Sequence, residues 1–235
     1  MEKVLVKKLI AFIDNFQKNP FRYLNESDLK IGLSAFIQEI EEYKEEIKVP
    51  VTLDKYEDEL KTNDADSVHY IDIPQILSEY IYFEKNNGKY VDLGQKFDLV
   101  ILDKEDPKSL AQIQEKSFKK YGNEAIWLQP VKYGFELKLT AGLDNDNFND
   151  FLYDFKDKIT KYRHDNCNFI GIAMYFCHFK TRFEDIKLRI PGGEFTEIKR
   201  ESLINELEDL NHKYFGIIVF RHKIYLATKN NKADK

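Results

Sequence analysis

Residues 97–102 read FDLVIL and residues 135–139 read FELKL, and these two stretches decide the expected fold. The first is almost entirely apolar, which is typical of a strand that is buried on both faces of a sheet. In the second, polar and apolar side chains alternate, so that Glu136 and Lys138 point to the same side of a strand. We therefore expect two strands of an α/β sheet, one of which presents an acid and a lysine together.

Asp98 is an acid inside the apolar stretch. Strand alternation puts it on the same face as Val100 and Leu102, where an ionised carboxylate costs several kcal/mol unless a cation compensates it. An acid followed two residues later by lysine occurs nine times in the chain, so this tripeptide by itself indicates nothing. Only the strand that carries Glu136 and Lys138 follows a buried-looking strand that contains an acid.

Two strand-borne carboxylates on one sheet face form a site of hard oxygen ligands, which suits Mg²⁺ or Mn²⁺. A lysine beside them can orient a water molecule and stabilise negative charge that develops on phosphorus. Asp98, Glu136 and Lys138 therefore predict metal-assisted hydrolysis of a phosphodiester. The spacing leaves an alternative open, because an ion pair of Lys138 with Asp98 or with Glu136 can also be purely structural.

A third acid, Glu26, is expected near the same sheet. It precedes Leu29 by three residues and Leu33 by seven, so that it lies on the core-facing side of a helix. Asn25 caps the start of this helix, and Asp28 completes a capping-box-like arrangement. The alternative is that Glu26 only favours the helix N-terminus through its charge.

Hydrophobic periodicity predicts an α/β plan with a mixed sheet and helices on its faces. Helices are expected over residues 2–17, from residue 25 to just before Pro50, and over residues 108–121, 147–163 and 200–210. Strands are expected over residues 75–83, 97–102, 133–140, 169–177, 185–190, 214–220 and 223–228. Turns are expected at residues 86–88 and 191–193, and an acidic surface connection at residues 51–68.

The composition is that of an ordinary soluble globular protein. Among its 235 residues, 14 Tyr and 18 Phe argue against disorder. No apolar run approaches the roughly 18 residues of a membrane helix, and residues 1–16 carry acids within their apolar run, unlike a signal peptide. Cys167 and Cys177 are the only cysteines, which excludes a disulfide scaffold and a CxxC zinc site. We expect the reducing cytoplasm as the compartment.

The net charge is −5, and it is unevenly distributed along the chain. Residues 51–106 carry 6 basic and 14 acidic side chains, whereas residues 107–138 and residues 167–235 each carry a net charge of +3. This excludes a globally basic nucleic-acid binder. It allows a local basic face opposite an acidic one.

The order of these elements resembles the PD-(D/E)XK nuclease superfamily, whose members share the restriction-endonuclease-like fold. The resemblance covers residues 25–177. It rests on NESDL at 25–29, QILSEYIYF at 75–83, FDLVIL, FELKL, and the amphipathic helix and apolar strand that follow them. Two features depart from the family: Phe97 stands where a proline is common, and the 38-residue step from Asp98 to Glu136 requires the helix at 108–121 to be an excursion from the sheet.

The resemblance implies roles for residues of this chain. Asp98 and Glu136 would bind the metal, assisted by the backbone carbonyl of Leu137. Lys138 would activate the attacking water.

Two further acids follow from the same resemblance. Glu26 would be the acid of the first helix, and Glu79 could add a carboxylate from the first strand. The implied architecture is one nuclease-like domain over residues 1–235, with an αβββαβ core over 25–177 and a C-terminal strand-helix-hairpin extension over 178–235.

The implied function is Mg²⁺- or Mn²⁺-dependent endonuclease cleavage of DNA in a restriction, defence or repair system. The partners expected are DNA, a second copy of the chain or other subunits of such a system, and no membrane. The alternative is a catalytically inactive nuclease-like domain that serves as a nucleic-acid-binding or protein-assembly module.

Overall fold

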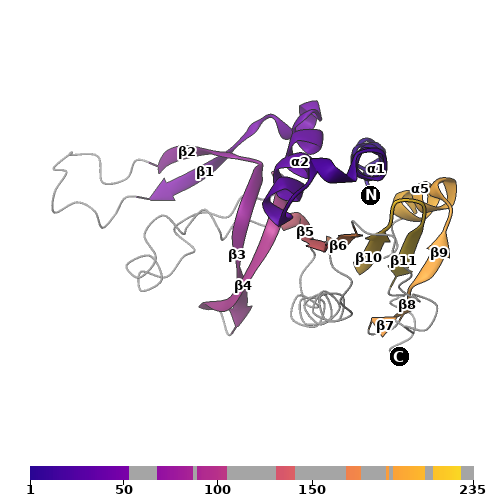
Figure 1. Ribbon diagram of the computed structural model, residues 1–235. Helices are drawn as coiled ribbons and strands as arrows, with labels where there is room; N and C mark the ends of the chain where they lie inside the picture. The colour runs from indigo at the N-terminus through magenta and orange to yellow at the C-terminus, as the bar shows by residue number, and fades with distance from the viewer. Residues whose placement is uncertain are drawn as a thin grey trace. The chain divides into compact units, whose positions relative to one another are not determined.

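Two compact units make up the chain, which Figure 1 shows as a computed structural model. Unit 1 consists of Met1–Ile40 and Tyr133–Lys235, and unit 2 consists of Glu41–Lys132. We describe each unit by itself. The structure describes residues 1–52, 68–86, 89–104, 131–140, 168–175, 189–190, 193–209 and 214–228.

Unit 1 is built on a mixed β-sheet. Its parallel part consists of β5 (Val131–Thr140), β6 (Asn168–Tyr175) and β10 (Tyr214–Val219). The strands β11 (Ile224–Thr228) and β9 (Thr196–Ile198) continue the sheet beyond β10 in antiparallel pairing. This arrangement confirms the predicted α/β class with a mixed sheet.

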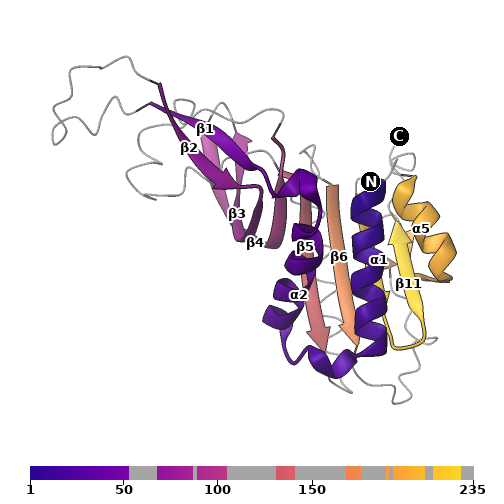
Figure 2. The ribbon, with the colours of Figure 1, turned by 90° about the horizontal axis from the view of Figure 1, so that it is seen from above.

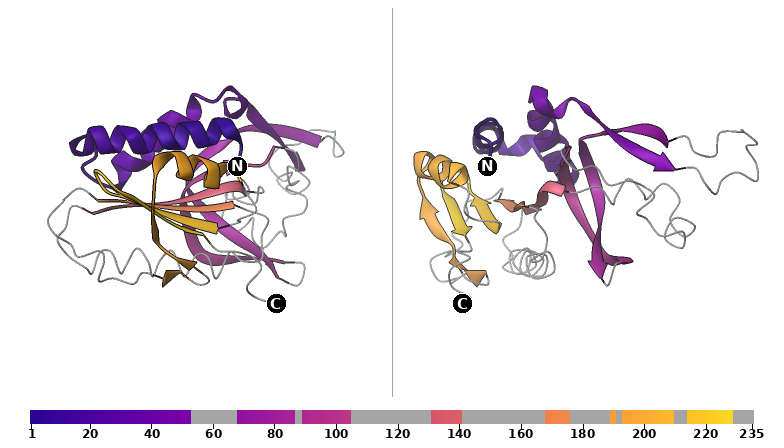
Figure 3. Two further views of the ribbon diagram at one scale, coloured as in Figure 1. Left: turned by 90° about the vertical axis from the view of Figure 1, so that its right-hand side faces the viewer. Right: turned by 180° about the vertical axis from the view of Figure 1, so that it is seen from behind.

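The described helices of unit 1 lie on one face of this sheet (Figures 2 and 3). They are α1 (Lys3–Lys18), α2 (Glu26–Gln38) and α5 (Arg200–Glu208), and the 3₁₀ turn η1 (Pro20–Arg22) joins α1 to α2. The apolar positions of α1 recur at helical spacing and are buried: Leu5, Val6, Leu9, Ile10, Phe12, Ile13 and Phe16.

The two faces of the sheet differ around Glu136. Because strand residues alternate between faces, one face carries large apolar side chains on all three parallel strands, among them the fully buried Phe135, Leu137, Ile170, Ile172 and Ile217. The other face carries Glu136 and Lys138 on β5 and the small residues Gly171, Ala173 and Gly216 on the neighbouring strands, together with the buried Phe169 and Ile218. Since Glu26 of α2 lies 3.8 Å from Lys138, the helices cover this second face.

Aromatic rings join α1, η1 and α2. The ring of Phe12 meets Tyr23 edge-on at a centroid distance of 5.8 Å and meets Phe36 at 5.9 Å. The Tyr23 hydroxyl donates a hydrogen bond of 2.9 Å to Oδ1 of Asn15, which fixes the ring. Burial also raises the pKa of the Tyr23 hydroxyl above its usual value. On the far side of α1, Arg200 of α5 forms a bidentate ion pair with Asp14.

Gly32 allows the close approach of α2 to Tyr23. A Cβ atom at this position would lie 2.7 Å from Cε1 of Tyr23 and 3.3 Å from Cε2 of Phe12. We expect Gly32→Ala to lower the free energy of unfolding by about 1–3 kcal/mol, because overpacking outweighs the gain of about 1 kcal/mol in helix propensity. Urea unfolding measures this difference. Ser34→Ala on the same helix is the control and should change stability by about 0.5 kcal/mol or less. A more stable Gly32→Ala protein would show that the close approach is not required.

Unit 2 contains two antiparallel strand pairs. The strands β1 (Glu46–Thr52) and β2 (Val68–Pro74) form one pair, and β3 (Ile76–Asn86) and β4 (Lys89–Leu102) form the other. Between β2 and β3, Gln75 is buried and holds the end of β4: its backbone oxygen accepts from the Leu102 amide at 2.8 Å. Its Nε2 atom donates to the Leu102 carbonyl at 3.0 Å.

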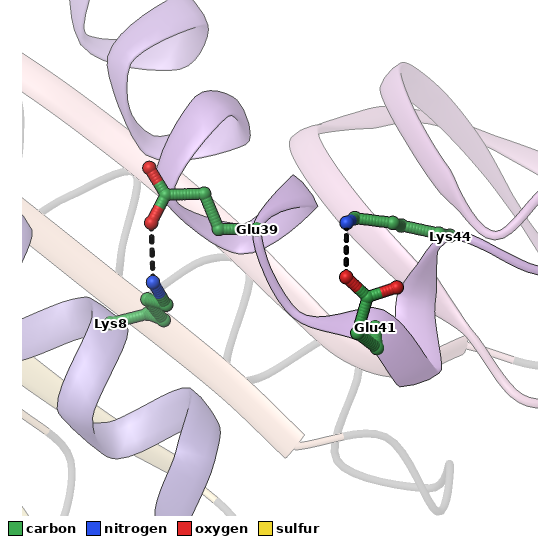
Figure 4. A network of polar contacts seen from close by, with 4 residues as sticks. All are labelled: Lys8, Glu39, Glu41 and Lys44. Atoms are coloured by element: carbon green, nitrogen blue, oxygen red, sulfur yellow. Dashed lines mark hydrogen bonds and ion pairs between the residues drawn. The ribbon is translucent and has the colours of Figure 1, made fainter.

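The predicted length of the second helix is wrong. The helix α2 ends at Gln38, the amide of Ile40 donates to the Ile37 carbonyl, and Ile47 lies in β1. The apolar residue Ile47 fits a helical stripe, but it also begins an alternating strand pattern, and a two-stranded sheet tolerates Pro50 at its edge. Ion pairs of Lys8 with Glu39 and of Lys44 with Glu41 flank this end of the helix (Figure 4).

Most other predicted elements of the described residues are confirmed, with shifted bounds. The strands β3 to β6, the helices α1 and α5 and the terminal hairpin of β10 and β11 lie where the periodicity predicts them. The sequence does not predict the strands β1, β2 and β9. The strand expected over 185–190 is described only at Arg189–Ile190 (β7), which pairs with Gly193–Glu194 (β8). The helices expected over 108–121 and 147–163 lie outside the described residues. The single-domain organisation stays a prediction.

Candidate active site

The start of α2 is held by a capping box that does not involve Glu26. The Asn25 side chain accepts a hydrogen bond of 3.0 Å from the Asp28 amide. In return, Oδ2 of Asp28 accepts from the amides of Leu24 at 2.7 Å and Asn25 at 3.3 Å. The predicted capping box is confirmed. Glu26 is therefore placed at the first turn without being needed to cap it.

Lys138 lies between two acids on the helix-covered face of the sheet. Its Nζ atom is 3.8 Å from Oε1 of Glu26 and 3.9 Å from Oε1 of Glu136. Both distances are longer than a hydrogen bond, so these are charge–charge contacts. The side chains are exposed to very different extents, 5% for Glu136, 28% for Lys138 and 41% for Glu26. A buried acid, a partly exposed lysine and an acid at the rim thus follow one another towards solvent.

The burial of Glu136 is unusual for a carboxylate, because an ionised acid loses its hydration inside a protein. Glu136 pairs across the sheet with Gly171 of β6, which in turn pairs with Gly216 of β10. Of these three residues, Glu136 alone carries a side chain. A buried charge needs compensation, and Lys138 supplies it within the same strand.

Asp98 and Glu79 belong to unit 2. Asp98 lies on β4 between the buried residues Phe97 and Leu99 and is itself partly exposed. On β3, Ser78 pairs with Leu99 and Tyr80 with Phe97, so that the backbone of Glu79 lies at the level of Asp98. The strand assignment of Asp98 is confirmed. Its meeting with Glu136 and Lys138, which belong to unit 1, stays a prediction.

Of the predicted site residues, the structure brings Glu26 to 3.8 Å and Glu136 to 3.9 Å from Lys138, and their roles stay predictions. Leu137, whose carbonyl is a predicted ligand, has its side chain fully buried on the opposite face of β5. Within the part of the chain that the structure describes, no group of three or more His, Cys, Asp or Glu residues is arranged to hold a metal ion.

Comparison with protein-family models, with curated proteins and with solved structures gives no match for this chain. Among the described helices, none has both the length and the apolar character required to cross a bilayer.

Proposed function

We propose that the chain is a metal-dependent endonuclease with a restriction-endonuclease-like αβββαβ core, and that it hydrolyses phosphodiester bonds in DNA. The position of Lys138 carries the proposal. Its ammonium group lies 3.8 Å from Glu26 and 3.9 Å from the buried Glu136, so that a cation and two acids meet on one face of an α/β sheet. These are the side chains that metal-assisted phosphodiester hydrolysis requires.

The donor set fits Mg²⁺ or Mn²⁺. Mg²⁺ commonly binds proteins through one or two carboxylates and keeps water molecules in its remaining positions, so a pair of acids suffices. Glu136 and Asp98 would hold the ion with the carbonyl of Leu137, and Glu26 and Glu79 are further candidates. When bound, such an ion polarises a phosphoryl oxygen and acidifies a water molecule.

The chain's own residues supply the remaining chemistry. The partly exposed ammonium group of Lys138 can donate a hydrogen bond to a water molecule on the solvent side and orient it for attack. The same positive charge stabilises the negative charge that develops on phosphorus. Glu26 at the rim keeps Lys138 directed along this face, because its carboxylate attracts the ammonium group at 3.8 Å.

Cleavage of supercoiled plasmid by the purified chain tests the proposal. We expect nicked or linear DNA with Mg²⁺ or Mn²⁺ and none with EDTA, and a parallel reaction on RNA defines the polymer. An intact plasmid at all concentrations of both metals would contradict the proposal.

The second candidate function is an inactive nuclease-like module in the same type of system. The contacts of Lys138 favour it, because a lysine that pairs with both Glu26 and Glu136 neutralises the buried charge without any metal. Such a module would bind DNA or a protein subunit equally well in EDTA and would cleave nothing. For either function we propose the cytoplasm as the compartment and a second copy or other subunits as partners.

Glu26→Gln separates a role in the site from a role in the helix. We expect Mg²⁺-dependent cleavage to fall by at least about 10-fold, because the charge beside Lys138 is lost. The free energy of unfolding should change by about 1 kcal/mol or less, since exposed ion pairs contribute little and the cap is made by Asp28. Asp28→Ala is the matched control: it should lower stability by about 0.5–2 kcal/mol and leave cleavage intact. A destabilised but fully active Glu26→Gln protein would remove Glu26 from the site.

A further inference from the structure

One edge of the sheet in unit 1 gathers segments that lie far apart in the sequence. Leu139 near the end of β5 pairs with Met174 of β6, which pairs with Val219 at the end of β10. The tight turn between β10 and β11 follows directly, closed by a hydrogen bond of 2.8 Å from the Phe220 amide to the Lys223 carbonyl. This is the edge at which the parallel strands β5, β6 and β10 end, and we call it the carboxyl edge.

The helices bring η1 and Glu26 to the carboxyl edge. The Nε2 atom of Gln17, at the end of α1, donates a hydrogen bond of 2.7 Å to the carbonyl of Phe220. The turn η1 and the start of α2 come next in the chain, and Glu26 lies beside Lys138. Figure 2 shows the connection from α1 to α2 at the same end as the arrowheads of β5 and β6.

Exposed cations lie at this edge. Lys18 and Arg22 are exposed in α1 and η1, and Arg221 and Lys223 are exposed in the turn after β10. Lys223 forms an ion pair of 3.0 Å with Glu197. Within the described residues, Lys18, Arg22 and Arg221 form no ion pair. Among the described residues, Lys18, Arg22 and Arg221 are therefore cations without an acidic partner on the same side of unit 1 as the acids of the candidate site, although the chain as a whole is acidic.

Two large apolar side chains are exposed among these cations. Phe21 is 75% exposed and Leu24 is 78% exposed, on either side of the buried Tyr23. The backbone beneath them is fixed, because the Tyr23 amide donates to the Pro20 carbonyl at 3.2 Å and the Leu24 amide donates to Asp28. A fixed turn that presents a phenyl ring next to Arg22 combines a stacking surface with a phosphate-binding charge.

We propose that the carboxyl edge of unit 1 binds an unpaired nucleic-acid strand, with bases against Phe21 and Leu24 and phosphates on Lys18, Arg22 and Arg221. The proposal rests on the proposed function and names the substrate of that site: a single strand, or an unpaired stretch next to a duplex. Two strand spacings separate β5 from β10, roughly 10 Å, a distance that a few nucleotides of an unpaired strand can span. A strand bound there would pass directly over Glu26 and Lys138.

The apolar groups decide between an unpaired strand and an intact duplex. A duplex offers phosphates to a protein but keeps its base faces stacked on one another, so its bases cannot stack on Phe21 or contact Leu24. An anionic bilayer would accept both the apolar and the basic side chains. The neighbouring Glu26 and Lys138 favour the strand, because the proposed function gives these side chains a phosphodiester to act on, which a bilayer does not offer.

Fluorescence anisotropy with a labelled 12-nucleotide DNA strand tests the proposal, in EDTA so that no cleavage occurs. The wild-type protein should bind the single strand more tightly than the same sequence as a duplex. Phe21→Ala should weaken single-strand binding by about 5- to 100-fold, which corresponds to the loss of one stacked base. Arg22→Gln and Arg221→Gln should each lower the slope of log affinity against log salt by about 0.7.

Ile31→Ala is the matched control, because Ile31 is 69% exposed on α2 but is not part of η1 or of the turn after β10. It should bind the strand like the wild-type protein, and circular dichroism melts show that each variant is folded. Equal affinity for strand and duplex, or an unaffected Phe21→Ala protein, would overturn the proposal. Phe21-dependent binding to phosphatidylserine vesicles without binding to the strand would do the same and would assign the edge to a membrane.

The experiment also separates this proposal from the proposed function. Phe21-dependent strand binding by a protein that cleaves no plasmid supports the binding edge and rejects the nuclease. Cleavage that persists in Phe21→Ala, together with unchanged strand binding, supports the nuclease and rejects the binding edge.

Discussion

Glu136→Gln should reduce Mg²⁺-dependent cleavage of plasmid DNA by at least about 100-fold, which is the scale of losing a group that stabilises charge in the transition state. The substitution retains the size of the side chain and removes its charge, so it changes the donor set of the site and not the packing around Gly171. Initial rates of nicking measure the loss. Glu206→Gln, an exposed acid on α5, is the control and should cleave like the wild-type protein.

Thermal melts show whether the loss comes from the site or from the fold. In EDTA, Glu136→Gln should unfold within a few degrees of the wild-type protein, because a buried carboxylate is costly and Lys138 retains Glu26 as a partner. Mg²⁺ should raise the melting temperature of the wild-type protein, since a ligand that binds only the native state stabilises it, and should not raise that of the variant. A Glu136→Gln protein that keeps more than about one-tenth of the cleavage rate would exclude Glu136 as a metal ligand.

The parts of the site that sequence predicts correctly are those set by local periodicity. Strand alternation puts Glu136 and Lys138 on one face, and helix periodicity aligns Glu26 with Leu29 and Leu33, both of which are buried. Each step uses residues that are close in the chain. The two steps agree in the structure, because α2 lies on the face of the sheet that carries Lys138, so that Glu26 is 3.8 Å from the lysine.

The features that the sequence does not predict are of two kinds. Some residues fit two secondary structures equally well, and some contacts join residues that are far apart in the chain. Ile47 fits both a helical stripe and a strand, and the pairing with β2 decides for the strand. Phe21 was not singled out, because exposure of an apolar residue depends on tertiary packing, and Tyr23 instead fills the core there. The turn that carries Arg221 reaches the same edge through a hydrogen bond between Gln17 and Phe220, residues 203 positions apart, which no local pattern indicates.

Asp98→Asn should also reduce cleavage by at least about 100-fold, and it tests whether unit 2 supplies a ligand to the chemistry of unit 1. Asp98 lies on the face of β4 that it shares with the buried Val100 and Leu102, and it is itself partly exposed. Because asparagine retains the size and shape of the side chain, the melting temperature in EDTA should change by only a few degrees. Asp72→Asn, an exposed acid on β2, is the control within the same unit and should leave both cleavage and melting unchanged.

The double variant shows whether Asp98 and Glu136 act together. Residues that serve one catalytic unit are not additive: once one is lost, losing the second costs little more. We expect Asp98→Asn with Glu136→Gln to cleave no more slowly than either single variant. Losses that multiply would mean that the two acids act independently, and an unchanged rate in Asp98→Asn alone would confine the chemistry to Glu26, Glu136 and Lys138. The comparison of cleavage rates therefore tests whether Asp98 takes part in the same catalytic site as Glu136. A Mg²⁺ titration of the same variants then shows whether the loss lies in metal affinity or in the cleavage rate at saturating metal.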